Sequence, residues 1–482
     1  DYSQWYLDVI AAGELVDKSP VRGCMVIKPH GYGIWESIQK DLDARFKATG
    51  HVNAYFPLFI PESFLSKEAE HVEGFAKECA LVTHHRLRSK EGGGVEPDPA
   101  AKLEEPLVVR PTSETIIWHM YGKWINSHRD LPLLINQWAN VVRWEMRTRP
   151  FLRTAEFLWQ EGHTAHATEN EAMDEALKML GVYRDFAWET LAVPVIPGIK
   201  SATERFAGAE ETFTIEAMMQ NGWALQAGTS HFLGQNFAKA FDVTFQNTEG
   251  TLEHVWATSW GVSTRLVGAV IMAHSDDVGL VLPPKIAPIQ VVLVPIWRKD
   301  QDKERVLEFT KAVQAKLGSQ FRVHTDAREK MKPGAKYFEW ERKGVPLRFE
   351  IGPRDVDNNS VFCAKRTGDK KFGIPVDGDF TATVDKLLEG IQTGLLESAI
   401  ERRDANTHHV NTYEEMKTQI EQTGGFYLAP WCDDADKERE IKEDCKATIR
   451  CYPLDAQEDL ASKSCFYTGR PATHMAIFAR AY

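Results

Sequence analysis

The pattern of apolar and polar positions is most informative between residues 141 and 166, VVRWEMRTRPFLRTAEFLWQEGHTAH. Apolar and charged side chains alternate along residues 141–145, as they do in a half-buried strand. Residues 155–164 form a second run, rich in aromatic and β-forming residues. Between the two runs, a proline and three arginines indicate a loop. The pattern therefore predicts a β-hairpin.

At a strand period of two, odd-numbered residues share one face of each strand. The residues placed on or near one surface are Arg143, Glu145, Arg153, Phe157, Trp159, Glu161 and His163. Together, these side chains are too polar for a core, and they suit an anionic nucleotide and a charged amino acid. The alternative is a salt-bridged, solvent-exposed sheet face, but such faces rarely place Trp and Phe between the charges.

Elements upstream of the hairpin follow from helical and strand periodicity. The pattern predicts a helix at 3–15, a strand at 22–28, a helix at 31–50 and a strand at 53–59. Ser3 is the expected N-cap of the first helix, and Gly50 the expected C-cap of the second. Pro57 indicates that the second strand lies at an edge or an interface.

Between these elements and residue 274, turn residues separate further segments. Residues 84–106 are charged and rich in Gly and Pro, which predicts a mobile surface loop without chemistry. Thr112, Ser113 and Glu114 are expected where a strand turns into a helix that Ser113 could cap. The pattern further predicts two weaker helices at 169–192 and a strand at 210–219. A strand and a helix follow at 224–241, with Gln226, Thr229 and His231 at the turn between them. A last strand and helix are expected at 257–274.

Prolines at 283 and 284 mark a domain junction, which is followed by a buried β-run at 290–296. Helices then alternate with strands, so a compact α/β module with a mostly parallel or mixed sheet is expected. From about residue 400 the chain is charged and helical, and it ends in a small β-rich module. We therefore expect an α+β and α/β multidomain protein with domains at 1–284, 285–400 and 401–482.

Composition excludes some classes of protein. The 482 residues suffice for several domains, and no apolar run is long enough to cross a membrane. The net charge of −12 argues against a non-specific nucleic-acid coat, although local basic patches remain compatible with an RNA substrate. Seven widely spaced cysteines fit a reducing, cytoplasmic setting. The first residue is Asp1, so a removed targeting segment stays open. There is no Walker A or GxGxxG motif.

Three segments carry a resemblance to a known family. Arg143-Trp144-Glu145, the loop and Phe157 resemble motif 2 of class II aminoacyl-tRNA synthetases, and Gly261, Arg265 and Gly268 resemble motif 3. The runs RPTSE and FLWQEGHTAHAT resemble the prolyl-tRNA synthetases. The long helix and the Pro57 strand resemble motif 1, which implies a homodimer. The interval 145–265 is too short for the editing domain that bacterial-type prolyl enzymes insert there.

The resemblance implies an antiparallel catalytic sheet with flanking helices, an anticodon-binding domain and a zinc-binding-like C-terminal module. It implies that ATP activates L-proline as an adenylate, with Mg²⁺, and that proline is then transferred to tRNA(Pro). Arg143 would hold the α-phosphate and the substrate carboxylate, and Phe157 and Arg265 would hold the adenine between them. The remaining ATP contacts implied are Glu145, Arg153, Thr154, Gln226 and Thr229.

Proline is a cationic secondary amine with an apolar ring, so its pocket needs a carboxylate and aromatic side chains. With Arg143, the resemblance implies that the pocket consists of Thr112, Glu114, Trp159, Glu161, His163, Phe206, His231, Ser259 and Gly261. Either histidine alone could equally be a structural residue.

Two other classes of protein are alternatives to a prolyl-tRNA synthetase. A non-catalytic paralogue that binds tRNA or a partner usually loses a motif 2 or motif 3 arginine, whereas this chain keeps both. A class II synthetase for threonine or histidine fits the pocket segments less well, and the threonine enzymes use a zinc ligand set in the pocket, where this chain has no cysteine.

Two predictions concern the later domains. Glu341, Arg348 and Arg354 suit the edges of anticodon guanines, with an ordinary surface ion-pair cluster as the alternative. In the last module, Cys432 has no second cysteine nearby, and Thr468 stands where the resemblance leads us to expect one. Structural zinc favours closely spaced cysteine pairs. We therefore expect no zinc and a fold kept by apolar packing.

Overall fold

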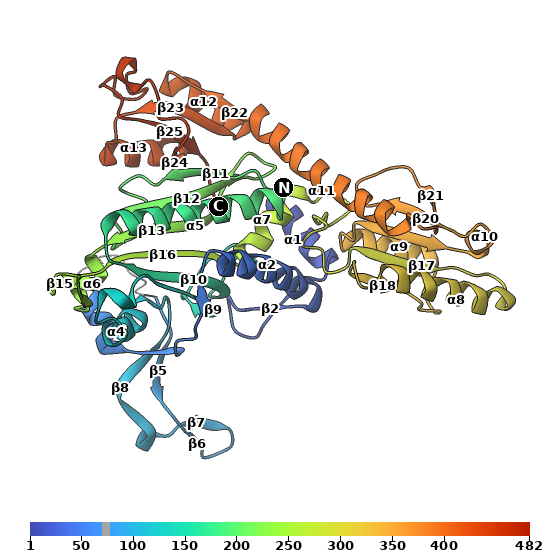
Figure 1. Cartoon of the computed structure of the whole chain (residues 1–482), viewed down its shortest axis with the longest axis horizontal. Coiled ribbons are helices and arrows are strands. Elements are labelled where there is room, and N and C mark those ends of the chain that lie inside the picture. The colour runs from blue at the N-terminus through green and yellow to red at the C-terminus, as the bar shows by residue number, and fades with distance from the viewer. Residues whose placement is uncertain (70–77) are drawn as a thin grey trace.

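The computed structural model describes residues 1–69 and 78–482, and a sheet of eleven strands runs through the body of the molecule (Figure 1). In spatial order the strands are β22 (Thr407–His409), β23 (Phe426–Trp431), β25 (His474–Ala479), β24 (Thr448–Pro453), β11 (Ile196–Ile199), β12 (Glu211–Met218), β13 (Ala224–Gly234), β16 (Trp256–Ser263), β10 (Glu156–His166), β9 (Leu133–Val142) and β3 (Val52–Asn53). Neighbouring strands are antiparallel except in the two outermost pairs. The expected antiparallel catalytic sheet is confirmed.

Helices cover one face of this sheet and bury the main core against it. They are α1 (Tyr2–Ala12), α2 (Pro29–Ala48), α5 (Glu169–Glu189) and α7 (Arg265–His274). The four-residue apolar repeat of α2 is buried there, as its pattern predicts. On β10, Leu158 packs against this core, whereas Trp159 and Glu161 line a cavity. Side chains of β10 therefore alternate between the core and the face of the sheet that carries the cavity.

A projecting arm replaces the surface loop expected at 84–106 (Figure 1). It is built from β4 (Phe59–Pro61), α3 (Glu62–Ala69), β5 (Leu81–His84), β6 (Leu87–Ser89), β7 (Val95–Pro97), η1 (Pro99–Ala101) and β8 (Lys102–Val109). The loop prediction is wrong because opposite charges pair across the strands, as Arg88 does with Glu96, and consecutive glycines form the turn between β6 and β7. Residues 54–58 are not a strand, so the expected strand at 53–59 is split.

Four further local predictions need correction. Asp1, not Ser3, caps α1, because its carboxylate accepts a hydrogen bond from the Ser3 amide. The two helices expected at 169–192 are one, since the apolar stripe of α5 continues past Gly181. Gln226, Thr229 and His231 lie within β13 rather than at a turn. β9 ends at Val142, so Arg143 and Glu145 lie in the connection after it, where a single backbone bond from Arg143 N to Ala155 O extends the pairing.

The remaining elements of the first 284 residues complete the catalytic body. They are β1 (Val16–Lys18), β2 (Met25–Ile27), α4 (Glu114–Trp124), η2 (His128–Asp130), α6 (Asn236–Ala240), β14 (Thr244–Gln246) and β15 (Leu252–His254). Between residues 145 and 265, all of which are described, the long strands belong to the central sheet and α5 covers it. This interval therefore forms part of the catalytic body and holds no separate globular domain.

A second sheet follows the proline junction. Its strands, in spatial order, are β18 (Val323–Thr325), β17 (Val291–Pro295), β19 (Leu347–Ile351), β20 (Ser360–Lys365) and β21 (Phe372–Pro375), accompanied by α8 (Asp300–Leu317), α9 (Pro333–Arg342) and α10 (Pro353–Asp357). The pairs β18–β17 and β17–β19 are parallel, whereas the pairs β19–β20 and β20–β21 are antiparallel. The expected mixed sheet is confirmed.

The long helix α11 (Phe380–Ala405) leads from the second sheet to the C-terminal module, which also holds α12 (Tyr413–Thr423), α13 (Ala435–Cys445) and η3 (Leu460–Ser462). Strand β24 of this module pairs with β11, which joins the module to the catalytic sheet. The Tyr482 hydroxyl also accepts a hydrogen bond from Asn221 Nδ2 at 2.6 Å. Among the described residues, no helix is both long and apolar enough to cross a bilayer.

Candidate active site

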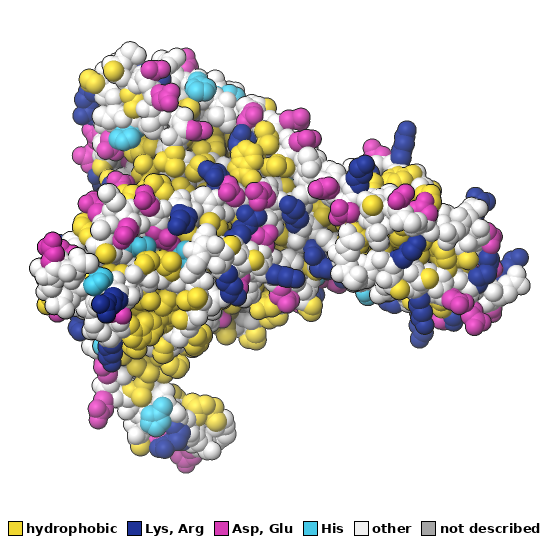
Figure 2. Space-filling model, viewed as in Figure 1, with side chains coloured by type: hydrophobic (Ala, Val, Ile, Leu, Met, Phe, Trp, Pro, Cys, Tyr) yellow, Lys and Arg dark blue, Asp and Glu magenta, His cyan; other side chains and the backbone are white. Residues whose placement is uncertain are grey.

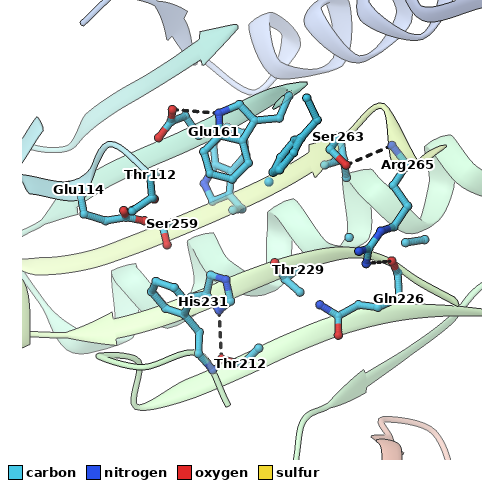
Figure 3. A pocket seen from close by; sticks show the side chains of 18 of the residues that line it. Thr112, Glu114, Glu161, Thr212, Gln226, Thr229, His231, Ser259, Ser263 and Arg265 are labelled. Atoms are coloured by element: carbon cyan, nitrogen blue, oxygen red, sulfur yellow. Dashed lines mark hydrogen bonds between the residues drawn. The ribbon is translucent and has the colours of Figure 1, made fainter. Parts of the chain in front are cut away.

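A cavity of about 310 Å³ opens on the face of the catalytic sheet opposite the helices, between β10, β13 and β16 (Figure 3). Of the residues singled out in the sequence, those lining it are Thr112, Glu114, Arg143, Phe157, Trp159, Glu161, His163, Phe206, Gln226, Thr229, His231, Ser259, Gly261 and Arg265. They come from strands, helix starts and connections far apart in the chain, which the fold gathers into one site.

Glu161 is the most firmly held carboxylate in the cavity. Its Oε2 accepts hydrogen bonds from Ser113 Oγ at 2.7 Å, Gln137 Nε2 at 3.1 Å and Trp159 Nε1 at 3.1 Å. Its Oε1 lies 2.7 Å from His163 Nε2. Burial alone would raise the pKa of Glu161, but the hydrogen bond and charge of His163 outweigh burial and hold this pKa below its ordinary value. The carboxylate is therefore charged.

His163 is the partner of Glu161, and the adjacent carboxylate favours its protonated form. Burial would lower its pKa, but the adjacent Glu161 carboxylate raises it above its ordinary value. The sequence could not assign Ser113 and Gln137 to this cluster. Ser113 precedes α4 as a cap would, yet its side chain makes no capping bond and turns to Glu161 instead.

A second carboxylate, Glu114, lies where the chain enters α4, and the Thr112 hydroxyl donates a hydrogen bond to its Oε2. With Glu161, it makes this end of the cavity acidic. A cationic amine with an apolar body fits such an end, because Trp159 and Phe206 line the same cavity.

Two arginines also line the cavity. The Arg143 guanidinium lies over the rings of Phe157 and Trp159, 5.6 and 5.4 Å from their centroids, and its Nε donates to Pro111 O at 2.8 Å. Arg265, the first residue of α7, donates to Leu152 O at 3.1 Å and Gln226 O at 3.3 Å. Burial lowers the pKa of Arg265 to about 10, which leaves it charged near neutral pH. Two guanidinium groups lining one cavity favour an anionic ligand.

His231 differs from His163 in its environment. Its Nδ1 lies 3.0 Å from the Thr212 hydroxyl, and its ring packs against Phe206 with centroids 4.6 Å apart. Burial, assisted by the charge of His163, lowers the pKa of His231 to about 3. The environments of the two imidazoles therefore shift their pKa values in opposite directions.

Three residues expected at the site do not line this cavity. Thr154 lines a neighbouring cavity on the other side of Phe157. Arg153 lines another, together with Arg265 and Tyr482. Glu145 lines neither of them, and its carboxylate lies 3.7 Å from Arg153 Nη1.

Of the three residues expected to read the anticodon, two line a separate cavity of about 320 Å³, most of whose lining comes from the second domain. Arg348 Nη1 donates to Glu341 Oε1 at 2.8 Å. Arg354 does not line this cavity and lies in α10.

The four cysteines of the C-terminal module do not meet at one point, although the Cys432 and Cys465 side chains contact each other. Cys445 and Cys451 are buried in two different apolar clusters. Cys432 Sγ accepts hydrogen bonds from Arg470 Nη2 at 3.3 Å and Thr468 Oγ1 at 3.5 Å. Within the described parts of the chain, no three His, Cys, Asp or Glu residues form a group that could hold a metal ion.

Comparison with known families agrees with this fold and site. Residues 97–274 match the family described as "tRNA synthetase class II core domain (G, H, P, S and T)", and residues 290–391 match "Anticodon binding domain". The antiparallel sheet, whose cavity is lined by both arginines and carboxylates, is thus that of a class II aminoacyl-tRNA synthetase.

The particular family follows from the last module and from full-length relatives. Residues 413–482 match "Prolyl-tRNA synthetase, C-terminal". A proline--tRNA ligase of Porphyromonas gingivalis is 59% identical over all of this chain and 97% of its own length, and one of Amoebophilus asiaticus is 56% identical over all of this chain and 98% of its own. The chain belongs to the prolyl-tRNA synthetase family.

A solved structure agrees with this assignment. The prolyl-tRNA synthetase of Cryptosporidium parvum complexed with L-proline and AMP superposes with a TM-score of 0.91 at 39% identity, covering all of this chain and 95% of that one.

Proposed function

We propose that this protein attaches L-proline to tRNA(Pro) in two steps. The proline carboxylate attacks the α-phosphorus of ATP, which forms prolyl-adenylate and releases pyrophosphate. A terminal hydroxyl of the tRNA then attacks the prolyl carbonyl, which forms the ester and releases AMP. The observation that carries the proposal is one cavity lined both by the Arg143 and Arg265 guanidinium groups and by the buried Glu161 carboxylate.

In the first step the protein must hold two anions together and stabilise the charge that develops at phosphorus. Arg143 binds the α-phosphate and the proline carboxylate, since its planar fork offers two parallel donors. Arg265 and Phe157 hold the adenine between them, and Arg265 also reaches the γ-phosphate. Gln226, Thr229, Glu145, Arg153 and Thr154 complete the ATP contacts. Positioning and electrostatics supply most of the catalysis in this assignment.

Magnesium would be bound mainly by ATP itself. The described residues hold no group of three metal-ligating side chains, and Mg²⁺ in nucleotide sites commonly takes one or two protein oxygens beside phosphates and water. Glu145 and Gln226 offer such oxygens. When bound, the ion would neutralise charge on the phosphates.

At the acidic end, Glu161 and Glu114 receive the cationic amine of proline. Trp159, Phe206 and the neutral His231 surround the ring, and His163 holds Glu161 in place. Thr112, Ser259 and Gly261 line the same end of the cavity.

ATP–pyrophosphate exchange with each of the twenty amino acids tests the first step. Proline should drive exchange best, and another amino acid driving it much better would overturn the proposal.

Arg143→Lys keeps the charge but loses the fork, and should lower the exchange rate by about 100-fold or more, in line with losing about 3 kcal/mol of transition-state stabilisation. Arg129→Ala, an exposed arginine on η2, is the matched control.

For tRNA selection we propose that Glu341, Arg348 and Arg354 read the anticodon guanines. Support comes from the paired donor and acceptor that Arg348 and Glu341 present in one cavity. Arg348→Ala should impair charging of tRNA(Pro) and spare proline-dependent exchange. Equal loss in both assays would indicate a folding defect or a wrong assignment.

We also propose that the protein is a cytoplasmic homodimer. Seven free thiols fit a reducing compartment. Figure 2 shows apolar side chains gathered where the arm leaves the catalytic body, and the exposed apolar residues of this part of the chain include Val52, Tyr55, Phe59 and Leu81. Tyr55→Asp combined with Phe59→Asp should shift sedimentation from dimer to monomer. A wild-type protein that sediments as a monomer would contradict the assembly.

A further inference from the structure

The cavity that holds Glu341 and Arg348 lies at a junction between two domains. Most of its lining comes from the second domain, from α9, β19 and the turn after β20. Asp276 and Val278, however, belong to the catalytic domain, in the segment that directly follows α7. A ligand in this cavity would therefore touch both domains.

A bidentate ion pair closes the catalytic side of the cavity. Arg366 donates from Nη1 to Asp276 Oδ2 at 2.8 Å and from Nη2 to Asp276 Oδ1 at 2.6 Å. Its Nε donates to Glu341 O at 2.8 Å. The Arg366 side chain is 5% exposed. Arg366 thus connects the Asp276 carboxylate to the backbone of the residue expected to read a base.

The segment that presents Asp276 is itself fixed. The Asp276 carboxylate accepts hydrogen bonds from the Val278 and Gly279 amides at 3.0 and 3.2 Å, and Leu280 N donates to Arg342 O. A Cβ at Gly279 would come within 2.7 Å of the Arg342 Cα, so glycine permits this close approach. Asp276 is therefore set against the end of α9, which carries Glu341.

The chemistry of the cavity suits a nucleobase better than a phosphate. Three cations, Arg348, Lys365 and Arg366, face three carboxylates, Asp276, Glu341 and Asp369, so the lining offers donors and acceptors together. Arg348 is more than nine-tenths buried, and its Nε has no hydrogen-bond partner among the residues that the structure describes.

We propose that Asp276 is a positioning residue for tRNA recognition: through Arg366 it holds the wall of the cavity in which Glu341 and Arg348 take an unpaired guanine of the anticodon. The inference rests on the proposed anticodon role of this cavity and adds to it a residue of the catalytic domain. Asp276 lies two residues beyond the last residue of α7, whose first residue, Arg265, lines the catalytic cavity. One ten-residue helix, about 15 Å long, therefore joins the two sites.

Asp276→Asn tests the proposal because it removes the charge but keeps the shape of the side chain. Each variant is assayed for proline-dependent exchange without tRNA and for charging of two transcripts: tRNA(Pro), and the same transcript with an anticodon guanine changed to adenine. We expect exchange within about twofold of wild type. The kcat/KM for charging should fall about tenfold, mainly through KM, and preference for the guanine transcript should fall by a similar factor, as when one base contact worth about 1.4 kcal/mol is lost.

Two variants serve as controls. Asp277→Asn changes the neighbouring exposed carboxylate, which does not line the cavity, and should behave as wild type. Asp276→Glu keeps the charge and should recover part of the preference for guanine.

The outcomes separate the inference from the proposed function. If Asp276→Asn matches Asp277→Asn while Arg348→Ala loses its preference for guanine, Asp276 has no positioning role and the anticodon assignment stands. If Asp276→Asn lowers exchange and charging equally with the preference unchanged, the ion pair only supports the fold and the inference fails. If Arg348→Ala keeps full preference, the anticodon assignment fails and the inference with it. A wild-type protein that does not charge tRNA(Pro) would overturn the proposed function itself.

Discussion

Glu161 and His163 lie two residues apart on β10, and their side chains meet with His163 Nε2 2.7 Å from Glu161 Oε1. A strand period of two brings these side chains to the same face. Ser113 and Gln137, from two other parts of the chain, donate to the remaining carboxylate oxygen. The carboxylate is thus charged and fixed in direction before any ligand binds.

Glu161→Gln should raise the KM for proline and leave the KM for ATP within about twofold. The amide keeps the size of the side chain but loses the charge that faces the substrate amine. A hydrogen bond to a charged group is worth about 1.5–3 kcal/mol, so the KM for proline should rise about 10- to 150-fold. Exchange kinetics at varied proline and varied ATP measure both constants. Glu169→Gln, at an exposed position on α5, is the control, and an unchanged KM for proline in Glu161→Gln would remove Glu161 from the amine site.

The two histidines of the cavity should differ in protonation at neutral pH. His163 has a raised pKa because of Glu161, whereas burial lowers the pKa of His231 to about 3. With the protein labelled at histidine Cε1, NMR spectra should show the His163 signal in its imidazolium position at pH 6.5 and the His231 signal unchanged from pH 5 to 8. Spectra of His163→Gln and His231→Gln assign the two signals. Titration of His231 near pH 6.5 would contradict the burial argument.

These pKa shifts also fix how each histidine affects stability. His163 binds its proton more tightly when folded, so its stabilising contribution is complete below the unfolded value of about 6.5 and is lost as the pH rises through the folded pKa. His231 resists protonation when folded, so stability is lost as the pH falls from about 6.5 towards 3. The difference in unfolding free energy between wild type and His163→Gln should therefore shrink as the pH rises. The difference between wild type and His231→Gln should shrink as the pH falls.

The sequence predicted the face of β10 because alternation is a local property. Phe157, Trp159, Glu161 and His163 all line the cavity, as the odd-numbered pattern requires. Arg143 was expected on a strand but follows it, and its guanidinium still reaches the cavity because its backbone remains bonded to Ala155. Periodicity therefore predicted which side chains face the cavity, but it did not predict that β9 ends before Arg143.

Loop and long-range contacts could not be predicted in the same way. Arg153 and Thr154 line neighbouring cavities, since a loop has no period that would aim its side chains. The role of Ser113 depends on Glu161, 48 residues away in the chain, and no local pattern signals such a bond. The joining of β24 to β11 likewise pairs segments more than 200 residues apart.

A buried charge cluster should control how firmly the C-terminal module is attached. Lys200 Nζ donates to Glu216 Oε1 at 2.7 Å, and Arg450 Nε, on β24, donates to Glu216 Oε2 at 3.2 Å. Glu216→Ala would leave two buried cations without their partner, which costs about 3–5 kcal/mol. Hydrogen–deuterium exchange of β24 should accelerate accordingly. Glu440→Ala breaks an exposed pair with Lys437 and a hydrogen bond from Tyr467, and it should leave the exchange of β24 nearly unchanged. Equal exchange of β24 in the two variants would show that the cluster does not hold the module.

The last prediction concerns zinc in the C-terminal module. Structural zinc needs about four thiolate or imidazole ligands around one point. Here Cys445 and Cys451 lie in different apolar clusters, and Arg470 lies beside Cys432 with its Nη2 also 2.5 Å from Asp434 Oδ2. A guanidinium at that position would repel a dication. Elemental analysis of the purified protein should therefore find well below one zinc per chain, and exhaustive chelation should leave the thermal unfolding midpoint unchanged. About one zinc per chain, lost in Cys432→Ser or Cys465→Ser, would contradict this expectation. In that case Arg470 would have to leave Cys432, and Arg470→Ala should then increase the affinity for zinc.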